Sequence, residues 1–164
     1  MGRLITGLSN RYLAELGRIS VAFQAVEYHL RVAVSLLLST DSAVGHIVTA
    51  QLRGFEGLLS VLDSLYCLRV GDAKRRSRLE RLLKRAADAE DTRNRFIHSV
   101  WTGQGDRRYR PHRHKITLKR GHGLRHDFQV VPLRELRKLA VELEKIGYDA
   151  IDLENELLAE LPDR

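Results

Sequence analysis

Residues 9–38, SNRYLAELGRISVAFQAVEYHLRVAVSLLL, hold the pattern that determines the fold class. Apolar residues recur through this stretch at steps of three and four, which is the spacing of one face of an α-helix. Ser9 and Asn10, which are residue types favoured at the start of helices, come just before the pattern begins. The stretch therefore predicts one long amphipathic helix that ends at about Leu38.

A second long helix is predicted at the other end of the chain. Pro132, a residue type favoured in the first turn of a helix, marks its start. The apolar residues that follow, at alternating steps of three and four, are Leu136, Leu139, Leu143, Ile146, Ala150, Leu153 and Leu157. Such a seam packs on another helix, either antiparallel on the first helix or across a dimer axis. The intramolecular arrangement is favoured because both ends of the chain carry long helices.

Shorter helices are predicted between the two long ones. Apolar residues between Leu58 and Tyr66 mark a helix that ends before Gly71, although several glycines leave its first half uncertain. Asp72 can cap a further helix, which is strongly basic as far as Arg85 and fits one face on a core and one in water. Three helices therefore precede residue 92.

A β-hairpin is predicted before the last helix. Residues 115–119 and 126–131 alternate polar and apolar side chains around Gly121 and Gly123, which is typical of two strands joined by a tight turn. The sequence thus predicts an all-α, up-and-down helical bundle with long first and last helices and a small β-hairpin insertion near residues 114–131.

The length and composition are those of one ordinary domain. With 164 residues, of which 43% are apolar, the chain can bury a core without disulfides or a structural metal. We expect one domain over residues 1–164, with the hairpin insertion covering about residues 103–131. The single cysteine, Cys67, is expected to be buried in an apolar run, which fits a reducing cytoplasm. Neither a signal-peptide core nor an apolar run of about 18 residues is recognised, so a cytoplasmic protein outside the membrane is expected.

Charge is segregated along the chain, whose net charge is +7. Residues 74–85 hold seven Lys or Arg against one acidic residue, and residues 93–125 hold ten against one. Residues 141–164 hold eight Asp or Glu against two basic residues. A polyanion such as RNA is expected to bind the middle of the chain, with an affinity that falls as salt rises. A solvated basic face with no ligand is the alternative.

Residues 92–101, TRNRFIHSVW, are the one place where a catalytic site without a nucleophilic side chain can be assembled. On a helix, Asn94 and His98 lie at i and i+4 on one face, and Arg95 lies three positions before His98. Arg93 is five positions from His98, or roughly 140° around an ideal helix. Its long side chain must therefore bend round to reach His98, or the helix must be kinked, and a break near Arg93 would help.

These residue types suit the cleavage of RNA, in which the ribose 2′-hydroxyl attacks its own phosphate. An imidazole can accept or donate a proton near neutral pH, and a guanidinium stabilises charge on phosphate oxygens. His98 and Arg93 are accordingly the predicted catalytic residues, and Asn94 would orient His98 or the phosphate. Arg95 is a second phosphate contact or a surface charge. The scheme requires no metal or other cofactor.

The segment resembles the signature of the HEPN superfamily, in which an arginine and a polar residue are followed by a histidine several positions later. Arg93 and His98 match the two ends of the signature, with four residues between them, and Asn94 matches the polar position. The motif follows three predicted helices, as it does in the family, and basic charge clusters on both sides of it. The resemblance covers about the first 101 residues.

This resemblance implies a metal-independent endoribonuclease whose products are a 2′,3′-cyclic phosphate and a 5′-hydroxyl. It also implies a homodimer in which two motifs meet in a basic cleft, and a toxin or defence role restrained by an antitoxin or other inhibitory protein. Noncatalytic HEPN-like bundles that bind nucleic acids or protein partners are the alternative.

Further contacts with RNA are predicted in the basic segment before and within the hairpin. The predicted RNA-binding residues are Arg95, Arg107, Arg108, Tyr109, Arg110, Lys115, Lys119 and Arg120. Their arginines and lysines suit the phosphate backbone, and Tyr109 can stack on a base.

The motif also has a purely structural interpretation. His98 can pack at the edge of the core, with its ring on Trp101 or Phe96. Arg93 can form an ion pair with the carboxylates of residues 90–91. Spacing alone favours this interpretation, whereas the helical context, the basic flanks and the family resemblance favour the catalytic one.

Zinc and DNA are the other ligands that the sequence suggests. His112, His114 and His126 could bind zinc across the hairpin, but histidines at loose spacing, with no cysteine and in basic surroundings, favour a solvated or RNA-contacting surface. The basic helix over residues 74–85 could instead enter the major groove of DNA, as in a regulator. No convincing helix-turn-helix spacing precedes it.

Overall fold

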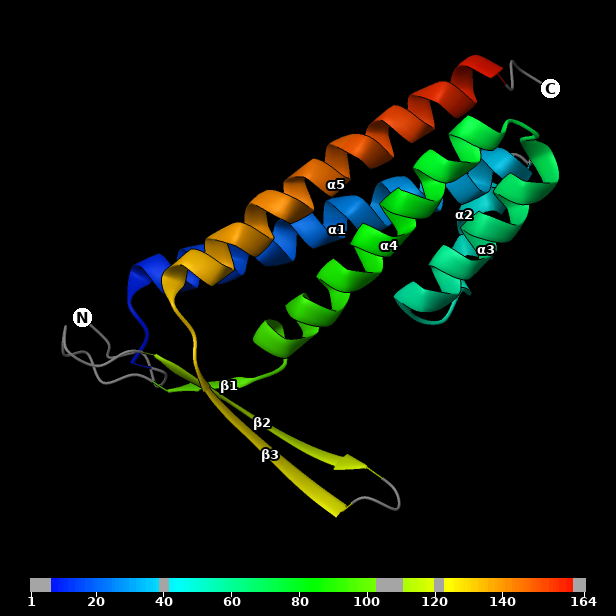
Figure 1. Cartoon of the computed structure of the whole chain (residues 1–164). Helices are drawn as coiled ribbons and strands as arrows, with labels where there is room; N and C mark the ends of the chain where they lie inside the picture. Colours follow the sequence, from blue (N-terminus) through cyan, green and yellow to red (C-terminus); the bar gives the residue numbers. More distant parts are fainter. Residues whose placement is uncertain (1–6, 39–41, 103–110, 120–122, 161–164) are drawn as a thin grey trace. The chain divides into compact units, whose positions relative to one another are not determined.

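The computed structural model describes residues 7–38, 42–102, 111–119 and 123–160, and these residues form five helices and three strands (Figure 1). The helices are α1 (Asn10–Leu38), α2 (Ser42–Ala50), α3 (Gly54–Arg69), α4 (Ala73–Ile97) and α5 (Leu133–Glu160). The strands are β1 (Val100–Thr102), β2 (His112–Lys119) and β3 (Gly123–Val130). The predicted all-α class, with long first and last helices and a small antiparallel β-structure, is confirmed.

The starts of α1 and α4 lie where their capping residues predict. The backbone N–H groups of Tyr12 and Leu13 donate to the carbonyl of Ser9, and the backbone N–H of Arg75 donates to Oδ1 of Asp72 at 2.7 Å. The apolar face of α1 is buried, and its buried residues include Ile19, Phe23, Val26, Leu30, Val34 and Leu37. Periodicity and capping chemistry therefore locate these helices correctly.

By length and composition alone, α1 could also cross a membrane, and no other described helix meets both criteria. An apolar stretch of this length was not recognised in the sequence. Core helices of soluble proteins meet the same criteria. The cytoplasmic location stays a prediction.

The uncertain stretch after α1 forms two helices instead of one. α2 lies close to α1, because a Cβ atom added at Gly45 would lie 2.8 Å from Cβ of Ser35. α3 then begins at Gly54, whose φ of +71° is a conformation that favours glycine. The glycines that made this region hard to interpret therefore mark a close helix contact and the start of a new helix.

Contacts within the chain group into two compact units. One unit comprises Met1–Val21 and Asp91–Val141, which contain the Arg93–His98 motif and the three strands. The other unit comprises Ala22–Glu90 and Glu142–Arg164. The helices α1, α4 and α5 contribute residues to both units. A single domain over residues 1–164 stays a prediction.

All seven residues of the predicted α5 seam are buried. Within the second unit, α5 lies beside α1 and runs parallel to it. Val26 lies 3.8 Å from the Cβ position of Gly147, and Nδ1 of His29 forms a 2.8 Å hydrogen bond with Glu154. Higher residue numbers in α1 thus meet higher numbers in α5. The intramolecular packing is confirmed, and the antiparallel direction is wrong, because α4 supplies the antiparallel neighbour of α5.

The predicted hairpin is confirmed, and a third strand joins it. β2 pairs antiparallel with β3, with Lys115 opposite Asp127. β1 pairs antiparallel with the other edge of β2, with Trp101 opposite Arg113, so the strand order is β1-β2-β3. β1 has no counterpart among the predicted elements, and Gly121 lies outside the described residues.

Cys67 is exposed, so its predicted burial is wrong. The buried side of this part of α3 consists of Leu62 and Tyr66, while Leu68 is also exposed. The apolar run that contains Cys67 is wider than the buried face of one helix, so its last residues extend onto the solvent side.

The seam of α5 gives a test of the fold. Leu143 is 0% exposed, whereas Val141 on the same helix is 40% exposed. We expect Leu143→Ala to lower the free energy of unfolding by about 2–5 kcal/mol, because it removes buried carbon atoms and leaves a cavity. We expect Val141→Ala to change it by about 0.5 kcal/mol or less. Chemical denaturation followed by circular dichroism measures both, and equal losses would show that the seam is wrongly assigned.

Candidate active site

The motif lies at the carboxyl end of α4. The helix continues without a break to Ile97, so Arg93 reaches His98 by bending its long side chain and not through a break near Arg93. The chain leaves the helix one residue later, and His98 lies in the turn that leads to β1. The backbone N–H of His98 donates to the carbonyl of Asn94 at 3.3 Å. The departure from helical geometry therefore occurs at His98.

Arg93 and His98 are brought together by the side chain of Arg93. Its Nη1 donates to Oδ1 of Asn94 at 2.9 Å and lies 3.3 Å from Nε2 of His98. A guanidinium can only donate, so Nε2 must be the acceptor and the ring proton must be on Nδ1. Asn94 orients Arg93 in this arrangement.

Trp101 holds the turn that carries His98. Its indole Nε1 donates to the carbonyl of Phe96 at 2.7 Å, and the ring centroids of the two residues are 6.2 Å apart. Tyr12 lies on the same cluster, with its ring centroid 6.4 Å from that of Trp101. Trp101 and Phe96 are buried while His98 is exposed, so packing of His98 within the core is not favoured. Phe96 and Trp101 therefore anchor the turn in the core.

Lys115 brings a second cation to the end of α4. Its Nζ donates to the carbonyl of Asn94 at 3.5 Å, and Arg95 is exposed on the last turn of the same helix. A helix carries partial negative charge at its carboxyl end, so cations are favourable there. Of the other predicted RNA contacts, Lys119 lies in β2, and nothing is described of its side chain. The predicted contacts that lie outside the described residues are Arg107, Arg108, Tyr109, Arg110 and Arg120.

Arg113 is a buried residue that the sequence analysis missed. It is 3% exposed, and its Nη2 donates to Asp127 at 2.6 Å and to Gln129 at 2.8 Å. A buried guanidinium needs such partners, and here it neutralises the acidic residue of β3. Alternation along β2 places Arg113 and Lys115 on the same face of the strand. The sequence does not indicate that this face is buried, because this part of the strand has no alternating apolar residues.

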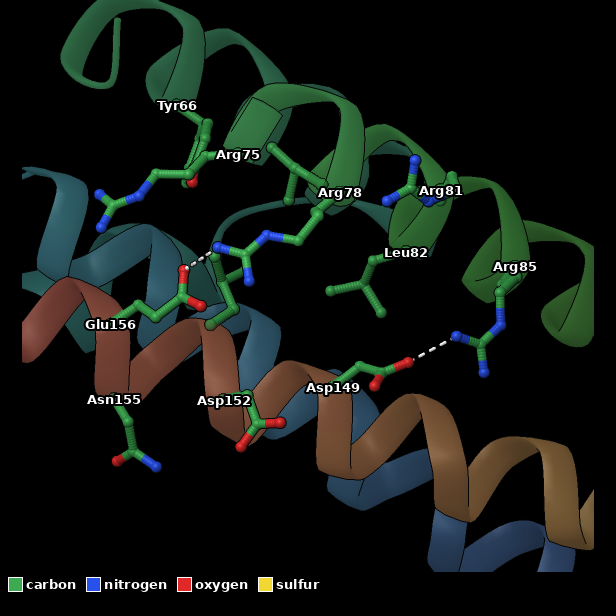
Figure 2. A pocket seen from close by; sticks show the side chains of 12 residues that line it. Tyr66, Arg75, Arg78, Arg81, Leu82, Arg85, Asp149, Asp152, Asn155 and Glu156 are labelled. Atoms are coloured by element: carbon green, nitrogen blue, oxygen red, sulfur yellow. Dashed lines mark hydrogen bonds and ion pairs between the residues drawn. The ribbon is translucent and has the colours of Figure 1, made fainter. Parts of the chain in front are cut away.

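The arginines of α4 lie beside an acidic face of α5, along an open groove of about 490 Å³ (Figure 2). The ion pairs are Arg75–Glu160, Arg78–Glu156, Arg85–Glu142 and Arg85–Asp149. The hydrogen bond to Glu142 raises the pKa of Arg85. The pKa of the Tyr66 phenol is raised mainly by burial and further by the negative charge of Glu156. Much of the positive charge in residues 74–85 is therefore neutralised within the chain.

This pairing changes what the two basic regions can bind. Residues 74–85 offer less charge to a polyanion than their composition predicts, and three of the arginines that would line a DNA groove face α5 instead. Residues 93–125 hold ten Lys or Arg against one acidic residue, and of the ten Arg113 is paired with Asp127. The larger excess of positive charge in the sequence therefore lies in the segment that contains Arg93 and His98.

The histidines of the hairpin do not form a metal site in the described part of the chain. The rings of His114 and His126 have centroids 5.7 Å apart. The described residues contain no group of three or more His, Cys, Asp or Glu side chains placed to hold a metal ion. The zinc hypothesis therefore has no geometric support among them.

Comparisons with protein-family models, with curated proteins and with solved structures found no match. The HEPN resemblance rests on the residues of this chain alone.

The two basic regions can be separated by mutation. We expect Arg85→Gln to lower the free energy of unfolding by about 1 kcal/mol or less, because the ion pairs of Arg85 with Glu142 and Asp149 are partly exposed. We expect the same change to leave the affinity for RNA unchanged. We expect Lys115→Gln to weaken RNA binding and to lower the slope of log affinity against log salt by about 1. Binding titrations at several salt concentrations measure both. A larger loss of affinity in Arg85→Gln than in Lys115→Gln would place the RNA on α4 and refute this assignment.

Proposed function

We propose that this protein is an endoribonuclease that cleaves RNA through attack of the ribose 2′-hydroxyl, with Arg93 and His98 as its catalytic residues. The observation that carries the proposal is the 3.3 Å distance between Nη1 of Arg93 and Nε2 of His98. It places a permanent cation, suited to phosphate, next to an imidazole that can accept a proton. His98 is exposed, so a substrate can reach it.

Substrate binding activates the histidine in this scheme. Without substrate, Arg93 donates toward the lone pair of Nε2 that must accept the proton. A phosphodiester competes for the guanidinium, because hydrogen bonds between two charged groups are stronger than those to a neutral ring. When Arg93 turns to the phosphate, Nε2 of His98 becomes available as a base. Arg93 therefore couples phosphate binding to the release of the catalytic nitrogen.

The chemical step needs no protein nucleophile. Nε2 of His98 accepts the proton of the 2′-hydroxyl, the 2′ oxygen forms a bond to phosphorus, and the bond from phosphorus to the 5′ oxygen breaks. The leaving oxygen takes a proton from an imidazolium or from water, giving a 2′,3′-cyclic phosphate and a 5′-hydroxyl. Arg93 stabilises the additional negative charge on the phosphorane. The scheme draws on no metal ion.

The neighbours of this pair have supporting roles. Asn94 holds Arg93 through the 2.9 Å hydrogen bond, which keeps the guanidinium beside the turn. Lys115 and Arg95 offset the negative end of the α4 dipole, which would otherwise repel a phosphate. Arg95 can contact the phosphate or act only through its charge.

The proposal extends to the assembly and the cellular role. On the HEPN resemblance, we infer a homodimer in which two Arg93–His98 pairs share a basic cleft. The same resemblance supports a toxin or defence function held in check by an antitoxin. A noncatalytic RNA-binding module is the outcome if the folded dimer binds RNA and cleaves none.

The catalytic role of His98 can be tested directly. We expect His98→Ala to lower the rate of RNA cleavage by about 100-fold or more while RNA binding is retained, because the base is lost and the phosphate contacts remain. Gel assays in EDTA measure cleavage, and fluorescence anisotropy measures binding. His46→Ala provides the control, since His46 is exposed on α2, and it should cleave like the wild type. Full activity in His98→Ala, or no cleavage by a folded wild-type dimer, would refute the proposal.

A further inference from the structure

The two faces of the β-sheet differ in chemistry. Residues directly opposite each other on paired strands share a face, so Val100, His114 and Phe128 form one row across the sheet. Alternation along the strands adds His112 and His126 to the same face. We call these five residues the aromatic face. The opposite face carries the buried residues Trp101 and Arg113, together with Lys115, which reaches the end of α4.

The rings of the aromatic face form a contiguous surface. The ring centroids of His112 and Phe128 are 4.6 Å apart with an interplanar angle of 30°, and those of His114 and Phe128 are 4.5 Å apart with an angle of 78°. His126 extends the row, with its ring centroid 5.7 Å from that of His114. Phe128 is 54% exposed and Val100 is 68% exposed. The face therefore presents ring surfaces to solvent.

Charge around this face favours a polyanion as its ligand. Residues 103–131 contain eight Lys or Arg and two Asp. One of the two acidic residues, Asp127, is already paired with Arg113. Exposed rings in a segment with an excess of cations suit single-stranded nucleic acid, because rings stack on bases while cations attract phosphates.

The aromatic face is also close to the proposed active site along the chain. Val100 follows His98 by two residues, a span of about 7 Å at most when extended. His114 lies opposite Val100 in the same row, whereas Lys115 projects from the other face of the sheet. A base that stacks on Val100 would thus lie close to His98 along the chain.

We propose that the aromatic face binds unpaired RNA bases by stacking, which makes single-stranded RNA the substrate class of the Arg93–His98 site. This inference rests on the proposed nuclease function. Bases in a duplex are stacked on one another and have no free ring faces, so duplex RNA can use only the cations. The sheet then selects unpaired segments of RNA, and the catalytic residues need not distinguish single-stranded RNA from duplex RNA.

The test measures binding and stacking in the His98→Ala protein, so that the RNA stays intact. The probe is a single-stranded RNA of about eight nucleotides, within the usual site size for such grooves. Phe128→Leu removes the ring and keeps an apolar side chain of similar size. We expect it to weaken binding on the order of tenfold, the effect of losing one base stack. We expect no change for an abasic strand of the same length, which has the phosphates alone.

A second readout reports on stacking itself. 2-Aminopurine in the RNA should lose fluorescence on binding to the parent protein and to Phe128→Trp, and should keep it with Phe128→Leu. Tyr148→Ala is the matched control, because Tyr148 is an aromatic residue, 70% exposed, on α5. It should bind the RNA like the parent protein.

Three results would overturn the inference. The first is unchanged RNA binding in Phe128→Leu. The second is an equal loss of affinity for base-bearing and abasic strands. The third is a change in the sedimentation of Phe128→Leu with unchanged RNA binding, which would make the face a protein interface. Failure of the nuclease proposal looks different, because the wild type would then cleave no RNA while Phe128→Leu still lost base-dependent binding.

Discussion

The hydrogen bond from the indole of Trp101 to the carbonyl of Phe96 determines where the helix ends and the sheet begins. It is 2.7 Å long, and both residues are buried. A buried carbonyl left without its donor costs about 1–3 kcal/mol, so this bond fixes the turn between the two residues. His98 lies in that turn, within reach of Arg93. The candidate site is therefore a consequence of how α4 stops.

Much of the helical structure could be predicted from local signals, whereas the arrangement of the helices could not. The seam of α5 and the caps at Ser9 and Asp72 are properties of single segments, so periodicity and capping chemistry were enough. Periodicity identifies a buried face but not the direction of the helix that covers it, and α5 proved parallel to α1. β1 has only three residues, too few for an alternating pattern. Cys67 was misjudged because its apolar run is wider than the buried face.

The candidate site was predicted in its members and only partly in its geometry. The structure brings Arg93, Asn94 and His98 together without a break near Arg93, because the side chain of Arg93 is long enough to reach His98 from an intact helix. The number of charged residues can be read from the sequence, but the ion pairs that they form cannot. The arginines of α4 are partnered by carboxylates far along the chain, as in the pair Arg85–Glu142, and only tertiary structure reveals this.

The central claim is that the 2′-hydroxyl of RNA is the nucleophile, activated by His98 while Arg93 holds the phosphate. The most direct measurement is cleavage of an RNA in which the ribose at the mapped cleavage position has been replaced by deoxyribose. The account predicts that the wild-type protein cuts the unmodified RNA to a 2′,3′-cyclic phosphate and a 5′-hydroxyl, and leaves the substituted position intact. Cleavage at the substituted position, or a product with a 5′-phosphate, would contradict it.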